Sequence, residues 1–333
     1  MARSIGIDTG SSVTRISARG KGIVFAEPTV VILNEAEEEM VAVGKEAAEM
    51  VGKTPDELSV CYPIHSGAIV HCDEACAMLS EFIGRAIGSA AGKLRVLAGV
   101  PSGITEIERL ALEEVIGDAG ATEVLLLDNA LLAAVGAERR VTQPRGTMVI
   151  DVGAGTTEVA VMSMGTIVAA ESLKIAGDQF DLDLEAYLRR KFGLIVDAEM
   201  AEGLKIAIGA VHPEIDRGEY EFCGRNSSTG LPLQATLRTP DILPCLTETA
   251  SAIAECARRV LEKIPPEMAA DILEDGIALT GGGAQLGGLD LYLSEMTKAP
   301  VTVAQDPANC TAHGLSRLLE YRGELRNLFR FQN

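Results

Sequence analysis

The order of apolar and polar positions along the chain predicts alternating strands and helices. Residues 4–8 and 147–151 are short apolar runs that each end in an aspartate, as expected of buried strands. Each run is followed by a glycine-containing turn and then by a second strand-like segment, at residues 13–17 and 158–161. The chain therefore carries two hairpins of the same design, one in each half.

A second pattern also occurs twice. Residues 95–100 have the composition of a strand, and a turn leads from them into a helix that begins at Glu106. Residues 276–280 are again strand-like, the glycine turn 281–283 follows, and the segment 284–292 is expected to lead into a helix. A hairpin followed by strand, turn and helix, present twice, indicates an α/β fold of two domains with like topology.

These repeats set the expected domain organisation. The first half is placed at residues 1–145, with a small inserted subdomain at about 32–74. The second half is placed at residues 146–333, with an inserted subdomain at about 182–245. A C-terminal helix at 314–330 is expected to pack back on the first half.

Composition narrows the class of protein. Of the 333 residues, 47% are apolar and 23% are charged, which is enough apolar material for a large core. The net charge of −19 argues against nucleic-acid partners and against docking on anionic lipid by charge alone. The apolar runs are too short to span a bilayer, no signal peptide is expected, and seven cysteines without a CxxC pair are typical of reduced thiols. These features predict a cytoplasmic protein.

The two hairpin turns are candidates for binding a polyphosphate. Glycine lets backbone N–H groups approach phosphate closely, and an aspartate can hold Mg²⁺ through water. Either turn alone is more typical of an ordinary hairpin, whereas equivalent turns in both halves favour one shared site for a magnesium-bound polyphosphate. The residues assigned to it are Asp8, Gly10, Ser11 and Ser12 in the first turn, and Asp151, Gly153, Ala154 and Gly155 in the second.

The glycine turn at 281–283 would let a nucleotide lie against the backbone, with helix N–H groups behind it. It is not a Rossmann fingerprint, because Leu286 stands where the last glycine is required. The Gly-Lys-Thr at residues 52–54 is not a P-loop, because Ala47 stands where the first glycine is required.

Taken together, the paired turns and the late glycine turn resemble the actin, Hsp70 and sugar-kinase superfamily. Residues 100–106, 149–161 and 261–267 are similar to MreB and Mbl, the rod-shape-determining bacterial actin homologues, and the similarity covers about residues 4–320. This resemblance implies an actin-like, duplicated ribonuclease H-like fold, with two domains of four subdomains around a nucleotide cleft.

The resemblance also implies a function. Members of this family polymerise in an ATP-dependent manner into filaments that organise cell shape and the cell wall. The ligands implied for this chain are ATP and Mg²⁺, with GTP as the alternative nucleotide. The implied partners are further copies of the chain and proteins of envelope and wall synthesis. The implied location is the cytoplasm, at the inner face of the cytoplasmic membrane.

Several further site residues follow from the resemblance alone. Glu202 and Lys205 match the family's contacts to the nucleoside, although by themselves they are more typical of a solvated helix face. Val13 lies in the phosphate turn, at a position where a polar residue is more usual. The turn beside adenine is matched by Gly281, Gly282, Gly283 and Ala284.

One departure from the family concerns hydrolysis. The family has Glu-Glu-Pro where this chain has Asp128, Asn129 and Ala130, and the second acid is thought to position the attacking water. The neutral amide of Asn129 can orient water but cannot accept its proton. We expect slow hydrolysis, with Thr157 and Asn129 placing water and with Asp8 and Asp151 placing Mg²⁺. The alternative is that Asn129 only caps the following helix.

A second departure concerns the membrane. The amphipathic N-terminal helix of the family is absent from this sequence, and the loop at 89–94 offers almost no large apolar side chain for insertion. Residues 317–333 combine apolar residues with arginines, which is compatible either with a helix docked on the protein or with a lipid anchor. Membrane contact is therefore left open.

Three functions remain after the sequence analysis. The first is a polymerising ATPase of the cytoskeleton. The second is a nucleotide-binding scaffold that does not cycle, which Asn129 and Val13 motivate. The third is a small-molecule kinase of the same superfamily, for which the chain is short and no spare acidic base is evident.

Overall fold

The structure is a computed structural model that describes residues 3–34, 36–37, 39–88 and 93–320. The expectations for the loop at 89–94 and for the chain after residue 320 therefore lie largely outside the described residues. Within the described residues, no helix has both the length and the apolar character needed to cross a bilayer.

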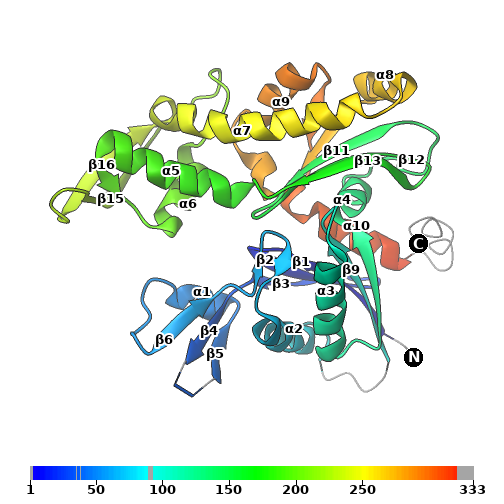
Figure 1. The fold of residues 1–333 in the computed structure, drawn as a ribbon, viewed down its shortest axis with the longest axis horizontal. Coiled ribbons are helices and arrows are strands. Elements are labelled where there is room, and N and C mark those ends of the chain that lie inside the picture. The colour runs from blue at the N-terminus through cyan, green and yellow to red at the C-terminus, as the bar shows by residue number, and fades with distance from the viewer. Residues whose placement is uncertain (1–2, 35, 38, 89–92, 321–333) are drawn as a thin grey trace.

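Two five-stranded sheets of the same topology form the centre of the molecule (Figure 1). In the first, with strand order β10-β9-β1-β2-β3, β1 pairs antiparallel with β2 and parallel with β9. In the second, with order β13-β12-β11-β17-β18, β11 pairs antiparallel with β12 and parallel with β17. The repeated hairpin and the strand beside it are thus confirmed. The strands are β1 Arg3–Thr9, β2 Val13–Ala18, β3 Gly22–Pro28, β9 Leu94–Val100, β10 Glu123–Asp128, β11 Thr147–Val152, β12 Thr157–Ser163, β13 Thr166–Leu173, β17 Ile277–Thr280 and β18 Val301–Val303.

Helices cover both sheets with apolar side chains. In the first half Phe82 and Met78 of α2 are fully buried against the sheet, and in the second half Ile253 of α7 is fully buried. The helix expected at Glu106 is present, because Thr105 and Glu108 form a capping box at its start. The helices other than α1, which is described with the smaller sheets, are α2 Cys72–Ile87, α3 Glu106–Asp118, α4 Asn129–Gly136, α5 Gly177–Phe192, α6 Ala198–Ile208, α7 Thr239–Glu262, α8 Pro266–Asp275, α9 Leu289–Thr297 and α10 Cys310–Glu320.

Smaller sheets lie at the predicted insertions. The first holds β4 Val31–Asn34, β5 Glu39–Val43 and β6 Leu58–Cys61, with helix α1 Lys45–Met50. The second holds β14 Leu194–Ile195, β15 Glu219–Asn226 and β16 Pro232–Arg238. A separate short hairpin, β7 Ile64–His65 with β8 Ala68–Ile69, follows the first of these sheets in the chain. The division at residue 145 and the limits of the insertions stay predictions.

The segment 284–292 leads into a helix as expected: a 3₁₀ turn, η1 Gly282–Gln285, comes first, and α9 begins at Leu289. Gly288 separates them, since its φ of +71° interrupts the helical backbone. The last helix starts at Cys310 rather than at residue 314, after the 3₁₀ turn η2 Pro307–Asn309.

Helices α4 and α10 are exchanged between the halves, because each packs on the sheet of the half to which it does not belong in chain order. α4 follows the last strand of the first sheet, yet its Ala130 and Ala133 belong to a core with Val149 and Ala160 of the second sheet. α10 follows the second sheet, yet it packs on β1 and β2. There the Ser17 hydroxyl donates to the carbonyl of Ala312 at 2.9 Å.

Glycine permits the close crossing of these two helices. A Cβ on Gly136 would lie 1.8 Å from the carbonyl oxygen of Cys310, and a Cβ on Gly314 would lie 2.0 Å from the carbonyl oxygen of Leu132. Real Cβ atoms do not approach backbone so closely, so any side chain here would push the helices apart. The contact joins the two halves.

We expect Gly314→Ala to lower the free energy of unfolding by about 2 kcal/mol, because the new methyl overpacks a backbone contact. Gly84→Ala is the matched control, since a Cβ on this helical glycine meets no atom within 4 Å. It should raise stability by about 1 kcal/mol through helix propensity. Urea unfolding followed by circular dichroism measures both, and equal effects would contradict the close crossing.

Candidate functional site

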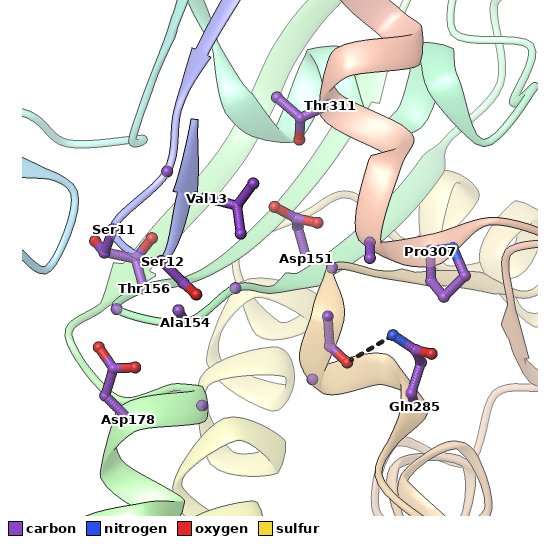
Figure 2. Close-up of a pocket in the computed structure, with 18 of the residues that line it drawn as sticks. Ser11, Ser12, Val13, Asp151, Ala154, Thr156, Asp178, Gln285, Pro307 and Thr311 are labelled. Carbon is purple, nitrogen blue, oxygen red and sulfur yellow. Dashed lines mark hydrogen bonds between the residues drawn. The ribbon is translucent and has the colours of Figure 1, made fainter. Parts of the chain in front are cut away.

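A cavity of about 410 Å³ lies between the two sheets, where the strand ends of both halves meet (Figure 2). Its walls come from the turn at 9–13, the turn at 153–156, the start of α5, the helix α6 and the turn at 281–283. In Figure 2, Ser11 and Ser12 of the first turn stand beside Ala154 and Thr156 of the second, and Asp151 lies deeper in the same space. The sequence-predicted turns thus line one cavity.

The two turns touch each other. A Cβ on Gly155 would lie 2.6 Å from Ser11 Oγ and 2.8 Å from Ser66 Cα, so only glycine allows this approach. Ser11 Oγ in turn accepts a hydrogen bond of 3.2 Å from the N–H of Gly67, in the β7–β8 hairpin. The contact holds the turns of the two halves at a fixed spacing.

The second turn is also fixed to helix α5. The first two N–H groups of α5, from Gly177 and Asp178, donate to the carbonyls of Gly153 and Ala154 at 3.0 and 2.8 Å. These donors would otherwise lack a partner at the helix start. The turn therefore points its remaining backbone into the cavity.

Asp8 and Asp151 are partly buried carboxylates at equivalent strand ends, and both line the cavity. Burial raises the pKa of each to about 6. The hydroxyl of Thr280 donates to Asp151 at 2.7 Å and opposes this shift, as does the guanidinium of Arg15, which lies 3.8 Å from Asp8. Buried carboxylates need a cation or hydrogen bonds to stay ionised. The carboxylate oxygens of Asp8 and Asp151 are suitable ligands for a hard cation such as Mg²⁺.

A chain of hydrogen bonds connects the halves behind the cavity. Glu158 of β12 accepts the N–H of Ser102 at 2.8 Å and the hydroxyl of Ser172 at 2.7 Å. The hydroxyl of Ser102 donates to Asp128 at 2.7 Å, and Asp128 accepts the N–H of Ala130 at 3.1 Å, which caps α4. Burial raises the pKa of Glu158 to about 8. The network had a sequence signal, since Glu158 is an acid inside an apolar strand.

Thr157 is not where it was expected. Its side chain is buried, and its hydroxyl donates to the carbonyl of Ile175 at 2.7 Å, away from the cavity wall. The neighbouring Thr156, at the end of the turn, lines the cavity. The structure therefore does not bring Thr157 to the cavity wall, and its water-placing role stays a prediction.

Ala284 also lies off the wall. It is buried in the core of the second half, because the 3₁₀ turn directs its methyl inward. Gly281, Gly282 and Gly283 do line the cavity. A Cβ on Gly282 would meet no protein atom within 4 Å, whereas one on Gly281 would lie 2.1 Å from the carbonyl oxygen of Val152.

Asn129 lines the cavity, and its Oδ1 is buried without a hydrogen-bond partner among the described residues. That oxygen lies over Gly99, where a Cβ would come within 2.1 Å of it. The cap of α4 is Asp128 and not Asn129, so the capping alternative is wrong. An unpartnered polar atom at this place is what a bound water or substrate would satisfy.

Glu202 and Lys205 of α6 line the cavity, as the family pattern indicates. Val13, at the end of the first turn, also lines it. Lys205 Nζ donates to Asp181 at 2.5 Å and to the carbonyl of Gly177 at 3.0 Å. Burial nevertheless raises the pKa of Asp181 to about 6. The charge of Lys205 is thus engaged within the protein.

Sequence reasoning missed part of the wall. Arg15 had a signal, because the hairpin register sets it directly opposite Asp8. The other missed positions lie beside the assigned residues of the three turns or in segments with no motif. They are Thr9, Gly67, Thr156, Gly177, Asp178, Phe180, Ile206, Arg217, Gln285, Leu286, Pro307, Ala308 and Thr311.

Comparison with known proteins gives matches over nearly the whole chain. The model of the MreB/Mbl protein family matches residues 2–327. The chain is 42% identical over 320 residues to the cell shape-determining protein Mbl of Bacillus cereus, covering 96% of each chain. Crystal structures of MreB5 of Spiroplasma citri bound to ADP and to AMPPNP superpose with a TM-score of 0.91, at 32% and 31% identity, over 100% of this chain and 99% of theirs.

A more distant likeness concerns the fold alone. The MamK double helical filament matches with a TM-score of 0.80 at 21% identity, over 97% of this chain and 100% of that one. Together these matches confirm the actin-like fold predicted from the sequence.

The raised pKa of Glu158 predicts a pH effect on stability. Because the folded protein binds this proton more tightly than the unfolded chain, the free energy of unfolding falls as pH rises from about 4.5 to about 8. Glu158→Gln keeps an acceptor for Ser102 and cannot titrate. Urea unfolding at pH 5 and pH 8 should show a decline smaller by about 3 kcal/mol in the variant. An identical decline in both proteins would contradict the assignment.

Proposed function

Because the chain belongs to the MreB/Mbl protein family, we propose that it binds ATP in the cavity between its halves and polymerises into cytoskeletal filaments that determine cell shape. The observation that carries this proposal is the pair of buried carboxylates, Asp8 and Asp151, at equivalent strand ends beside touching glycine turns. Such a site suits one polyphosphate held from both sides.

The cavity supports an adenine nucleotide. ATP is proposed over GTP because the MreB5 structures hold ADP and AMPPNP. The open space at Gly282 provides a smooth backbone wall on which a planar base could lie. Asp8 and Asp151 would hold Mg²⁺ through water, and the ion would neutralise charge on the phosphates. Glu202, Lys205 and the turn at 281–283 form the nucleoside side.

Hydrolysis is proposed to be slow. Asn129 and Thr156 line the cavity and can hold a water by hydrogen bonds. Neither can take its proton at neutral pH, so general-base assistance is lacking. The weak ATPase activity would serve as a timer for filament turnover.

The filament part of the proposal rests on relatives. MamK forms a double helical filament of the same fold, and Mbl is a cell shape-determining protein. We propose that nucleotide binding closes the halves and shifts the chain toward a filament-competent shape. Other copies of the chain are then the first partners, with wall-synthesis proteins as further ones, in the cytoplasm at the inner membrane face.

A scaffold that binds nucleotide without cycling is the second candidate. The observation in its favour is the neutral amide of Asn129, whose Oδ1 lies over Gly99 and accepts no hydrogen bond from any described residue. The two candidates differ in phosphate release, which a scaffold would lack.

Gly282→Ala tests the nucleotide site. The new methyl fits the protein but occupies the open wall, so we expect at least tenfold weaker ATP binding in calorimetry and fewer filaments in pelleting and electron microscopy with ATP. Gly117→Ala is the matched control, because it is a helical glycine with open space outside the cavity. Absence of ATP binding by the unmodified protein would reject the proposed function. Unchanged ATP affinity of Gly282→Ala would reject only the placement of the nucleotide against Gly282.

Asn129→Glu tests the hydrolysis step. The longer, ionised side chain can accept a proton from water, so phosphate release with ATP should rise about tenfold or more. Asn129→Gln has the same length without the charge and should stay near the unmodified rate. Equal rates in all three proteins, with normal filaments, would remove residue 129 from the mechanism.

A further inference from the structure

Arg15 is a cation placed at the two buried aspartates. The register of the first hairpin sets it opposite Asp8, and its Nη1 lies 3.8 Å from the Asp8 carboxylate. The side chain is 17% exposed and lines the cavity. In the second half, the position opposite Asp151 is Glu158, whose carboxylate is engaged by two serines. The equivalent strand pairs of the two halves therefore carry an arginine in one half and a glutamate in the other at this position.

The guanidinium is held in place from the other half. Arg15 Nε donates to Asn309 Oδ1 at 2.7 Å, and Nη1 approaches the carbonyl of Val13 at 3.4 Å. The amide of Asn309 is itself fixed by both oxygens of Asp306, at 3.0 Å each. Among the described residues, Nη2 has no hydrogen-bond partner. A fixed guanidinium with an available donor is suited to phosphate oxygens.

The other cations of the cavity are engaged elsewhere. Lys205 forms an ion pair with Asp181, and Arg217 donates to the carbonyl of Gly209 at 3.3 Å. Asp8, Asp151 and Arg15 together carry one net negative charge, and without Arg15 they would carry two. The charge of Arg15 also lowers the pKa of both aspartates against the effect of burial.

We propose that the Arg15 guanidinium is the protein's own cation for the phosphate chain of the nucleotide, so that binding depends only partly on Mg²⁺. The proposal rests on the proposed nucleotide site and deepens it. Arginine keeps its charge at every accessible pH and forms paired hydrogen bonds to phosphate, which a hydrated metal ion does not. Asn309 is then a positioning residue, because it acts through Arg15.

The test is ATP affinity measured by calorimetry on the full chain, once with MgCl₂ and once with EDTA. The ratio of the two dissociation constants reports how far binding depends on the metal. For the unmodified protein, we expect a ratio within about tenfold, because the guanidinium supplies part of the charge. For Arg15→Gln, we expect a ratio at least tenfold larger.

Arg15→Gln is chosen because its amide nitrogen replaces Nε and can still donate to Asn309, while the charged end is removed. Arg15→Lys retains the charge and should restore most of the metal-independent binding. Arg217→Gln is the matched control, since it removes one positive charge beside Gly209 and should weaken binding equally in both buffers. Thermal melts confirm that each variant is folded.

The outcomes separate this inference from the proposed function. Failure of the unmodified protein to bind ATP in both buffers would overturn both. Binding by the unmodified protein, with the same ratio in Arg15→Gln as in the unmodified protein, would overturn only the role of Arg15. An equal change of ratio in Arg217→Gln would also overturn it, because the effect would then belong to the cavity's total charge.

Discussion

The central physical constraint in this molecule is the burial of two carboxylates, Asp8 and Asp151, at one place. Each ends a strand in the middle of a sheet, where burial strongly disfavours an ionised side chain. The two turns that touch at Ser11 and Gly155 keep these groups at the same cavity. Such an arrangement is costly for an empty protein and favourable for one that binds a cation and an anion together. Any ligand that brings a cation to these two carboxylates would lower this cost.

The two halves are topologically equivalent but chemically different. Asp151 accepts a hydrogen bond from the hydroxyl of Thr280 on the neighbouring strand. The strand next to Asp8 has Gly99 in the equivalent place, and the side chain of Asn129 lies over this glycine. Arg15 compensates Asp8, and Glu158 reaches Ser102 in the other half. The two halves thus share a topology and differ in their side chains. In the first half Arg15 compensates the charge of Asp8, and in the second half Glu158 forms a contact with the first half.

The fold was predictable because its signals are local. An apolar run that ends in aspartate and glycine indicates a strand and a turn, and two such units indicate a duplicated fold. The family resemblance then supplied the nucleoside-side residues, which periodicity could not. The hydroxyl of Thr157 donates to the carbonyl of Ile175, whereas Thr156 lines the cavity, and the sequence of the turn alone does not tell which of the two threonines faces it. Glu158 is recognisable as an acid inside an apolar strand, but its partner Ser102 is far away in sequence, so no local pattern indicates their contact.

The exchange of α4 and α10 has a consequence for cooperativity. Each sheet is covered on one face by a helix that belongs, in chain order, to the other half. Neither half on its own would have a complete interior, and separating them would expose apolar sheet surface to water. We therefore expect the two halves to unfold together rather than as separate domains.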